Sequence, residues 1–186
     1  MDIRVIPSDL SSPAEAVLAK AGPPVTGILS WPKGEVRCAL GRGGVKAAKR
    51  EGDGATPAGA MPLRYLFYRP DREAQPVTRL PTRALAPEDG WCDDPASPEY
   101  NRHIRRPFAA RHEVLWRDDG LYDLMVVLGW NDAPPVPARG SAIFLHVTGE
   151  NYAPTEGCVA LARRDLVRLL ADCAQGDRLI VEPSSP

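Results

Sequence analysis

The sequence Ser-Ala-Ile-Phe-Leu-His at residues 141–146 is followed, at residues 155–161, by Thr-Glu-Gly-Cys-Val-Ala-Leu. The first segment is an apolar run typical of a strand and ends on His146, and the second places Cys158 directly after a glycine in a short turn. A thiolate is a strong nucleophile, an imidazole can accept its proton, and a neighbouring glycine lets backbone N–H groups turn toward a developing oxyanion. The pair indicates nucleophilic chemistry, although a lone cysteine in apolar surroundings is more commonly a packing residue.

The composition fits one domain with a real hydrophobic core, since 186 residues include 44% hydrophobic ones. A formal net charge of −1 gives no electrostatic case for a nucleic-acid partner. No apolar run is long enough to span a bilayer, and we expect a monomer. The first residues lack the basic and apolar regions of a secretory signal. We therefore expect a cytoplasmic protein, or a periplasmic one if a leader has been removed.

The four cysteines show no Cys-x-x-Cys pairing, which argues against a zinc ribbon or a thioredoxin-type motif. Cys38 alternates with apolar residues and Cys173 lies on an apolar helical face, so both are interpreted as packing thiols. His103 and His112 have no metal-ligand spacing and are expected at the surface. We expect neither a metal nor an organic cofactor.

The hydrophobic pattern predicts a fold that is mainly β with short helices. Strands are predicted at 3–6, 26–31, 35–40, 63–68, 121–128, 142–147 and 178–182, with a hairpin turn at 32–34. Short helices are predicted at 13–20 and, after Cys158, at 163–173. Long loops are expected at 41–59 and 70–101. We interpret 1–24 as an N-terminal segment that packs on a catalytic domain of residues 25–186, within a single domain overall.

Three segments together resemble the L,D-transpeptidase catalytic domain (YkuD-type) family. Its pattern is a histidine at a strand end followed by Ser/Thr-x-Gly-Cys-Val/Ile-x-Leu, which residues 155–161 match. Upstream, Thr56-Pro57-Ala58-Gly59 resembles the family's Thr-Pro-x-Gly segment. The resemblance covers about residues 25–182, and it implies a β-sandwich with a helix after the nucleophilic cysteine.

The resemblance implies acyl transfer on a peptidoglycan stem peptide. Cys158 would attack the carbonyl of the L-centre at the third residue and release the terminal D-Ala through a thioester acyl-enzyme. His146 would be the general base, and the backbone N–H groups of Gly157 and Cys158 would be candidates for the oxyanion hole.

The chain departs from the family pattern in three places. The family arginine two positions after the cysteine is replaced by Ala160, and its charge is expected from Arg139, Arg163 or Arg164. Val147 stands where a glycine often follows the histidine, which leaves open the group that orients the imidazole. Thr155 replaces the more usual serine and keeps the hydroxyl. These departures indicate a divergent subgroup.

A further set of residues is a candidate for substrate binding. Carboxylates and an amine on the substrate could be recognised by arginines and acidic residues, with aromatic side chains beside them. The candidates are Thr155, Arg139, Trp91, Asp93, Asp94, Tyr100 and Arg102. Ordinary ion pairs on a solvated loop explain much of the same set.

Three functions remain open at this point. A transpeptidase would pass the acyl group to an amine, and an L,D-carboxypeptidase would pass it to water during the recycling of muropeptides. A catalytically silent module that binds wall peptides is the alternative from another class.

Overall fold

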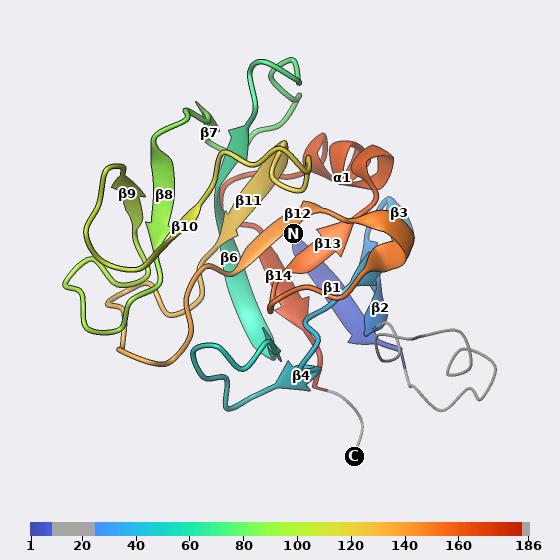
Figure 1. Cartoon of the computed structure of the whole chain (residues 1–186). Coiled ribbons are helices and arrows are strands. Elements are labelled where there is room, and N and C mark those ends of the chain that lie inside the picture. The colour runs from blue at the N-terminus through green and yellow to red at the C-terminus, as the bar shows by residue number, and fades with distance from the viewer. Residues whose placement is uncertain (9–24, 184–186) are drawn as a thin grey trace.

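Nine strands form the main sheet of the computed structural model, which describes residues 1–8 and 25–183 (Figure 1). Their order is β11-β12-β13-β3-β2-β1-β14-β6-β7, and β11 also pairs with β6. Eight strands therefore close into a barrel, and β7 pairs with residues 66–68 of β6 without being part of the closed ring. The strands are β1 (Asp2–Pro7), β2 (Thr26–Trp31), β3 (Gly34–Ala39), β6 (Gly59–Tyr68), β7 (Thr82–Ala84), β11 (Leu124–Leu128), β12 (Phe144–Val147), β13 (Val159–Leu161) and β14 (Arg178–Val181).

The predicted mainly-β class is confirmed, and so is the helix after Cys158, which is α1 (Arg163–Leu170). Closure of the sheet through the pairing of β11 with β6 is a feature that the sequence did not predict. The helix predicted at 13–20 lies outside the described residues. A 3-10 helix, η1 (Glu150–Tyr152), lies between β12 and β13.

The predicted hairpin is formed by β2 and β3, but its turn is shorter than expected. Gly34 pairs with Trp31 and belongs to β3, so only residues 32–33 make the turn. A side chain at Gly34 would meet the ring of Trp31 at 2.6 Å. The glycine therefore serves close packing against the indole within the strand, not the turn itself.

The prediction of an irregular loop at 70–101 is wrong, because β7 and β8 (Asp89–Cys92) lie within it. β8 is the central strand of a three-stranded sheet in which it pairs with β9 (His103–Arg105) and β10 (His112–Val114). This small sheet lies beside β6 and β11, away from the helix side of the barrel (Figure 1). The segment 41–59 is mostly irregular, with β4 (Val45–Lys46) paired to β5 (Thr56–Pro57).

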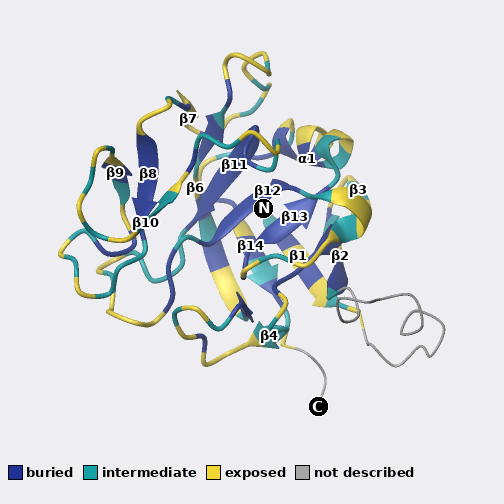
Figure 2. Ribbon diagram, in the orientation of Figure 1, coloured by how far each residue is buried: buried dark blue, intermediate teal, exposed yellow. Residues whose placement is uncertain are grey.

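Two hydrophobic clusters share the strands of the barrel. Leu124, Val126 and Leu128 of β11 belong to the barrel cluster, which also contains Leu166, Leu169 and Leu170 of α1. The intervening residues of β11, Met125 and Val127, belong to a second cluster together with Trp91 of the small sheet. β11 is consequently buried on both faces, and β12 and β13 are likewise buried along their length (Figure 2).

Candidate active site

The alternation of side chains along β12 and β13 brings Cys158 and His146 to one face of the sheet. Leu145 pairs with Val159 in parallel register, and both point into the barrel cluster. The neighbours of these two residues must point the other way, because successive side chains in a strand face opposite sides. Phe144 belongs to the second cluster with Cys158, and His146 lies about 7 Å further along β12.

The turn before Cys158 requires glycine at position 157. Gly157 has a φ of 129°, which L-residues rarely adopt, and an added Cβ would lie 2.7 Å from the carbonyl oxygen of Ala55. Thr155 closes the same turn from within: its hydroxyl accepts from the Gly157 N–H at 3.2 Å and donates to the Cys158 carbonyl at 2.7 Å. The turn is thus fixed from both sides, and Cys158 enters β13 in one orientation.

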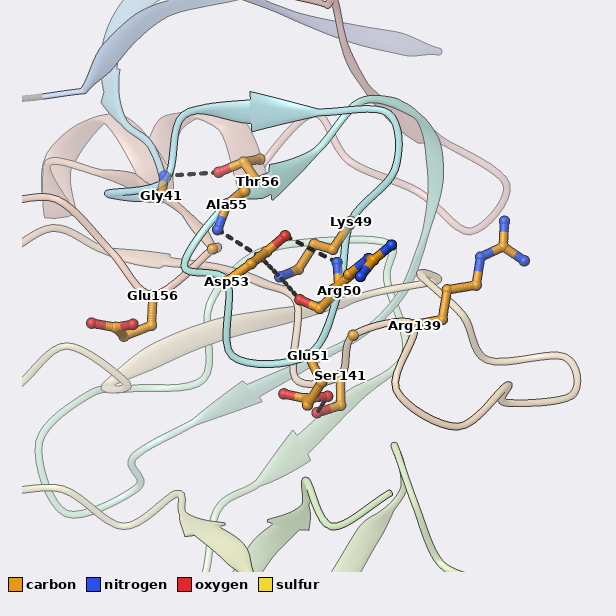
Figure 3. A network of polar contacts seen from close by, with 12 residues as sticks. Gly41, Lys49, Arg50, Glu51, Asp53, Ala55, Thr56, Arg139, Ser141 and Glu156 are labelled. Carbon is orange, nitrogen blue, oxygen red and sulfur yellow. Dashed lines mark hydrogen bonds and ion pairs between the residues drawn. The ribbon is translucent and has the colours of Figure 1, made fainter. Parts of the chain in front are cut away.

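The Thr-Pro-x-Gly segment contacts this turn directly. The hydroxyl of Thr56 accepts from the Gly41 N–H at 2.8 Å and donates to the Cys158 carbonyl at 3.3 Å. Thr56 is fully buried, so both bonds are shielded from water. Figure 3 shows Thr56 and Gly41 above the loop that carries Asp53. A segment 102 residues away in the sequence therefore helps to fix the position of Cys158.

The Cys158 thiol is held by the backbone at the start of β12. Sγ accepts from the Phe144 N–H at 3.4 Å and donates to the Ala142 carbonyl at 3.3 Å. Ala142 has a left-handed φ of 54°, which is uncommon for a residue with a Cβ. In the part of the chain that the structure describes, no hydrogen bond joins Sγ to the imidazole of His146. The resting thiol is directed at the backbone.

The imidazole of His146 is oriented by the carbonyl of the next residue. Nδ1 lies 2.8 Å from the Val147 carbonyl oxygen, which can only accept, so in the neutral ring Nδ1 carries the hydrogen and Nε2 the lone pair. The ring of Tyr122 packs edge-on against the imidazole at 5.2 Å between centroids. Burial lowers the pKa of His146 to about 4, although the hydrogen bond to Val147 opposes this shift.

Both members of the pair are uncharged at neutral pH. Burial raises the pKa of Cys158 to about 12, and the nearby carboxylate of Glu113 adds to the increase. A stable thiolate–imidazolium pair would need the thiol to be the stronger acid, which is the reverse of this order. The arrangement suits a general base that takes the proton as the sulfur attacks.

Cys158 and His146 both line a cavity of about 620 Å³. Its charged lining includes both signs: Lys49, Arg111 and Arg117 are cationic, and Glu51, Asp93, Glu113 and Glu156 are anionic. Of these seven charged residues, only Asp93 was a candidate from the sequence. They come from separate segments, and no motif spacing connects them to the Cys–His pair.

The sequence profile of the L,D-transpeptidase catalytic domain family (YkuD) matches residues 26–181. The chain belongs to this family. Comparison with curated proteins and with solved structures gave no significant match.

Not all the substrate-binding candidates of this L,D-transpeptidase-family chain reach the cavity. Thr155 and Asp93 line it. Trp91 is buried and packs edge-on against Phe144, and Tyr100 is buried behind Glu51, to which its hydroxyl donates. The remaining three lie elsewhere: Asp94 stabilises its own turn by accepting from the Ala96 N–H, Arg102 lines a second pocket, and Arg139 is exposed beside Trp130.

The three arginines that were expected to replace the family arginine, Arg139, Arg163 and Arg164, do not line the cavity. Ala160 is buried and pairs with His146 across the two strands. Arg163 is ion-paired with Asp123 and Glu73, Arg164 is exposed, and neither lines the cavity. Arg117 does line it and pairs with Asp119. A guanidinium from the segment before β11 therefore lines the same cavity as Cys158 and His146.

The helices, histidines and cysteines were also compared with what a membrane span, a metal site or a disulfide would require. None of the helices in residues 1–8 and 25–183 is long and apolar enough to cross a membrane. Within the same residues, no group of three or more His, Cys, Asp or Glu side chains is arranged to hold a metal ion. His103 and His112, expected at the surface, are half-buried in the small sheet, where His103 lies 3.0 Å from Asp89. All four cysteines are free thiols.

Proposed function

We propose that this member of the L,D-transpeptidase family catalyses cysteine-dependent acyl transfer on peptidoglycan stem peptides. The bond cleaved joins the L-centre of the third residue to the terminal D-Ala. The observation that carries the proposal is the placement of Cys158 and His146 on one face of β12 and β13, at one cavity. The family membership supplies the substrate class.

In the first half-reaction, Cys158 Sγ attacks the carbonyl carbon of the third residue while the thiol proton passes to Nε2 of His146. The carbonyl π-electrons move onto oxygen, and backbone N–H groups of the turn at Gly157 and Cys158 are the candidates to receive this oxyanion. Collapse of the tetrahedral intermediate breaks the C–N bond. His146 returns its proton to the leaving amine of D-Ala, and a thioester remains on Cys158.

In the second half-reaction, we propose that an amine attacks the thioester and loses a proton to His146. The C–S bond breaks, and the sulfur recovers the proton, so that the pair returns to its neutral state. Water in place of the amine would give the L,D-carboxypeptidase product. The two outcomes differ by the acceptor alone and share every residue of the first half-reaction.

Product masses test this function. Wild-type protein is incubated with a tetrapeptide ending in D-Ala, with and without an excess of an amine acceptor. We expect release of D-Ala, together with a new amide when the acceptor is present. A free tripeptide as the sole product in both reactions would assign hydrolysis instead.

The variants Cys158→Ala and His146→Gln are the matched tests of the residue roles. Both should lower the rate of D-Ala release by about 10⁴-fold or more while leaving the circular dichroism spectrum unchanged. Release that persists in Cys158→Ala would refute the proposed nucleophile. Binding of the tetrapeptide by wild-type protein without any release would identify the silent wall-peptide module.

A further inference from the structure

The side chain of Asn101 is a buried amide whose hydrogen-bonding capacity is fully used. Asn101 lies between β8 and β9, has a left-handed φ of 58°, and is 5% exposed. Its Oδ1 accepts from the indole N–H of Trp91 at 3.0 Å and from the Ala142 N–H at 3.1 Å. Its Nδ2 donates to the carbonyls of Trp130 and Asn131 at 2.9 and 2.8 Å. The two acceptor and two donor positions of an amide are therefore all occupied, in one orientation of the group.

These bonds close the base of the loop that connects β11 to β12. The carbonyls of Trp130 and Asn131 lie at the start of the loop, and the Ala142 N–H lies at its end. The backbone of the loop is irregular, with positive φ values at positions 131, 138, 140 and 142. A side chain from the small sheet thus holds together the two ends of a loop that runs to the start of β12.

The two partners of Oδ1 lead to the backbone groups that bind the nucleophile. The carbonyl of Ala142 accepts the hydrogen of the Cys158 thiol at 3.3 Å, while Asn101 binds the N–H of the same alanine. Trp91 packs edge-on against Phe144 at 5.1 Å between ring centroids, and the Phe144 N–H donates to Sγ at 3.4 Å. One amide oxygen is therefore linked to both backbone groups that hydrogen-bond to the sulfur.

The conformation of Ala142 explains why its N–H needs an anchor. Its φ of 54° lies in the left-handed region, where a Cβ atom crowds the following carbonyl oxygen. A residue with a Cβ keeps such a conformation only when its surroundings hold it there. Release of the N–H would let Ala142 relax to a negative φ, and the relaxation would turn its carbonyl away from the thiol of Cys158.

We propose that Asn101 is a positioning residue for the nucleophile: it holds Ala142 in the left-handed conformation in which the Ala142 carbonyl binds the Cys158 thiol. Asn101 itself lies outside the lining of the cavity that contains Cys158, so it acts through the backbone and not on a substrate. Its effect on a reaction rate rests on the proposed acyl transfer. Its effect on the thiol does not, because the hydrogen bond exists in the resting protein.

Infrared spectroscopy of the S–H stretch tests this positioning without a substrate. A thiol that donates a hydrogen bond absorbs at a lower wavenumber than a free thiol, because the bond weakens S–H. Subtraction of the matching Cys158→Ala spectrum isolates the band of Cys158. Asn101→Gly removes the amide, and glycine tolerates the φ of 58°. We expect the band to move to higher wavenumber in Asn101→Gly, and a band that stays at its wild-type position would overturn the proposal.

The rate of D-Ala release from the tetrapeptide is the second readout. Asn101→Gly should lower kcat about ten- to a hundredfold and leave KM within about threefold, because a misplaced nucleophile slows the chemical step without weakening binding. Addition of Ala142→Gly should recover most of the lost kcat, since glycine adopts a left-handed φ without an anchor. A role of Asn101 in general stability alone would not be rescued at position 142, so a double variant as slow as Asn101→Gly would contradict the proposal.

Asn131→Gly is the matched control. Asn131 has a φ of 48°, and its side chain makes three hydrogen bonds within the same loop, to Val136 and Gly140. The variant removes these loop bonds and leaves the Asn101 side chain in place. We expect the S–H band at its wild-type position and a kcat close to that of wild type. Equal effects of Asn131→Gly and Asn101→Gly would assign the role to the loop as a whole and overturn the proposal.

A second variant keeps the proposal testable if circular dichroism shows that Asn101→Gly does not fold. Asn101→Asp has the shape of the amide and keeps an acceptor oxygen for the Ala142 N–H, so the S–H band should stay at its wild-type position. A shifted band in this variant would contradict the proposal.

The two proposals fail separately. If wild-type protein releases no D-Ala, the acyl transfer is refuted, and the S–H band of Asn101→Gly still decides the role of Asn101. If D-Ala is released and the band of Asn101→Gly does not move, only the role of Asn101 is refuted.

Discussion

Alkylation of Cys158 by iodoacetamide should become about tenfold faster with each pH unit from pH 7 to pH 10. The reactive species is the thiolate, and a pKa of about 12 leaves about one thiol in 10⁴ ionised at pH 8. An ordinary cysteine with a pKa of about 8.5 is about one quarter ionised at that pH. The higher intrinsic nucleophilicity of the less acidic thiol offsets about 40-fold of this difference. We therefore expect a rate constant about 60-fold below that of free cysteine at pH 8.

The assay follows the mass of the intact protein after timed exposure to the reagent. One adduct should form, because Cys38, Cys92 and Cys173 are fully buried while Cys158 faces the cavity. Cys158→Ala is the control and should remain unlabelled over the same period.

The slope with pH is the diagnostic quantity, since restricted access of the reagent lowers the rate equally at every pH. A rate that stays constant between pH 6 and pH 9 would refute the reasoning. It would show that Cys158 is already ionised, as in a thiolate–imidazolium pair, and that His146 does not act on a neutral thiol.

Three other predictions follow from the geometry of the site. Gly157→Ala should lower the free energy of unfolding by about 2 kcal/mol and abolish activity, because the Cβ meets a carbonyl oxygen 2.7 Å away at a φ that glycine alone tolerates. Thr56→Val should lower the free energy of unfolding by about 1–3 kcal/mol, because it leaves the Gly41 N–H and the Cys158 carbonyl without their hydroxyl partner. Acidification from pH 6.5 to pH 4 should destabilise the protein by roughly 3 kcal/mol through His146, whose lowered pKa makes the unfolded chain bind the proton first.

Chemical denaturation measures the three predicted changes in the free energy of unfolding, each against a matched control. Gly44→Ala has a positive φ of 75° but nothing within 4 Å of its Cβ, so a loss equal to that of Gly157→Ala would contradict the steric argument. Thr56→Ser keeps the hydroxyl and should retain most of the free energy of unfolding. A loss in Thr56→Ser as large as that in Thr56→Val would assign the role of Thr56 to its methyl group instead. His146→Gln should flatten the stability profile between pH 6.5 and pH 4, and an unchanged profile would assign the pH dependence to other groups.

The sequence could predict that His146 and Cys158 are candidates for one site because the signals for both residues are local. His146 ends an apolar run and Cys158 follows a glycine in a turn, and the two-residue period of strands then places both on one face once β12 and β13 pair. The Thr-Pro-x-Gly segment was also noticed in the sequence, as part of the family resemblance. The contact of Thr56 with the Cys158 carbonyl gives that segment a physical role that the sequence did not predict. The carbonyl of Val147 resolves which group orients the imidazole.

The rest of the site depends on contacts between distant segments, which have no local pattern. Glu51 is anchored by residues 49 and 90 positions away, so nothing in its neighbourhood marks it. The predicted loop at 70–101 contains β7 and β8, strands of three and four residues whose pairing partners lie elsewhere in the chain. Proline and glycine are typical of loops, but short strands between them form when a partner edge is present. Closure of the barrel by β6 and β11 is likewise a long-range pairing.

Trapping of the acyl-enzyme tests the central claim most directly. Wild-type protein is mixed with a tetrapeptide ending in D-Ala, quenched in acid within the first turnover, and weighed intact. We predict a mass increase equal to the tripeptide acyl group, located on Cys158 after digestion, released by hydroxylamine and missing from Cys158→Ala. Release of D-Ala without any adduct on Cys158, or an adduct on another residue, would contradict the account.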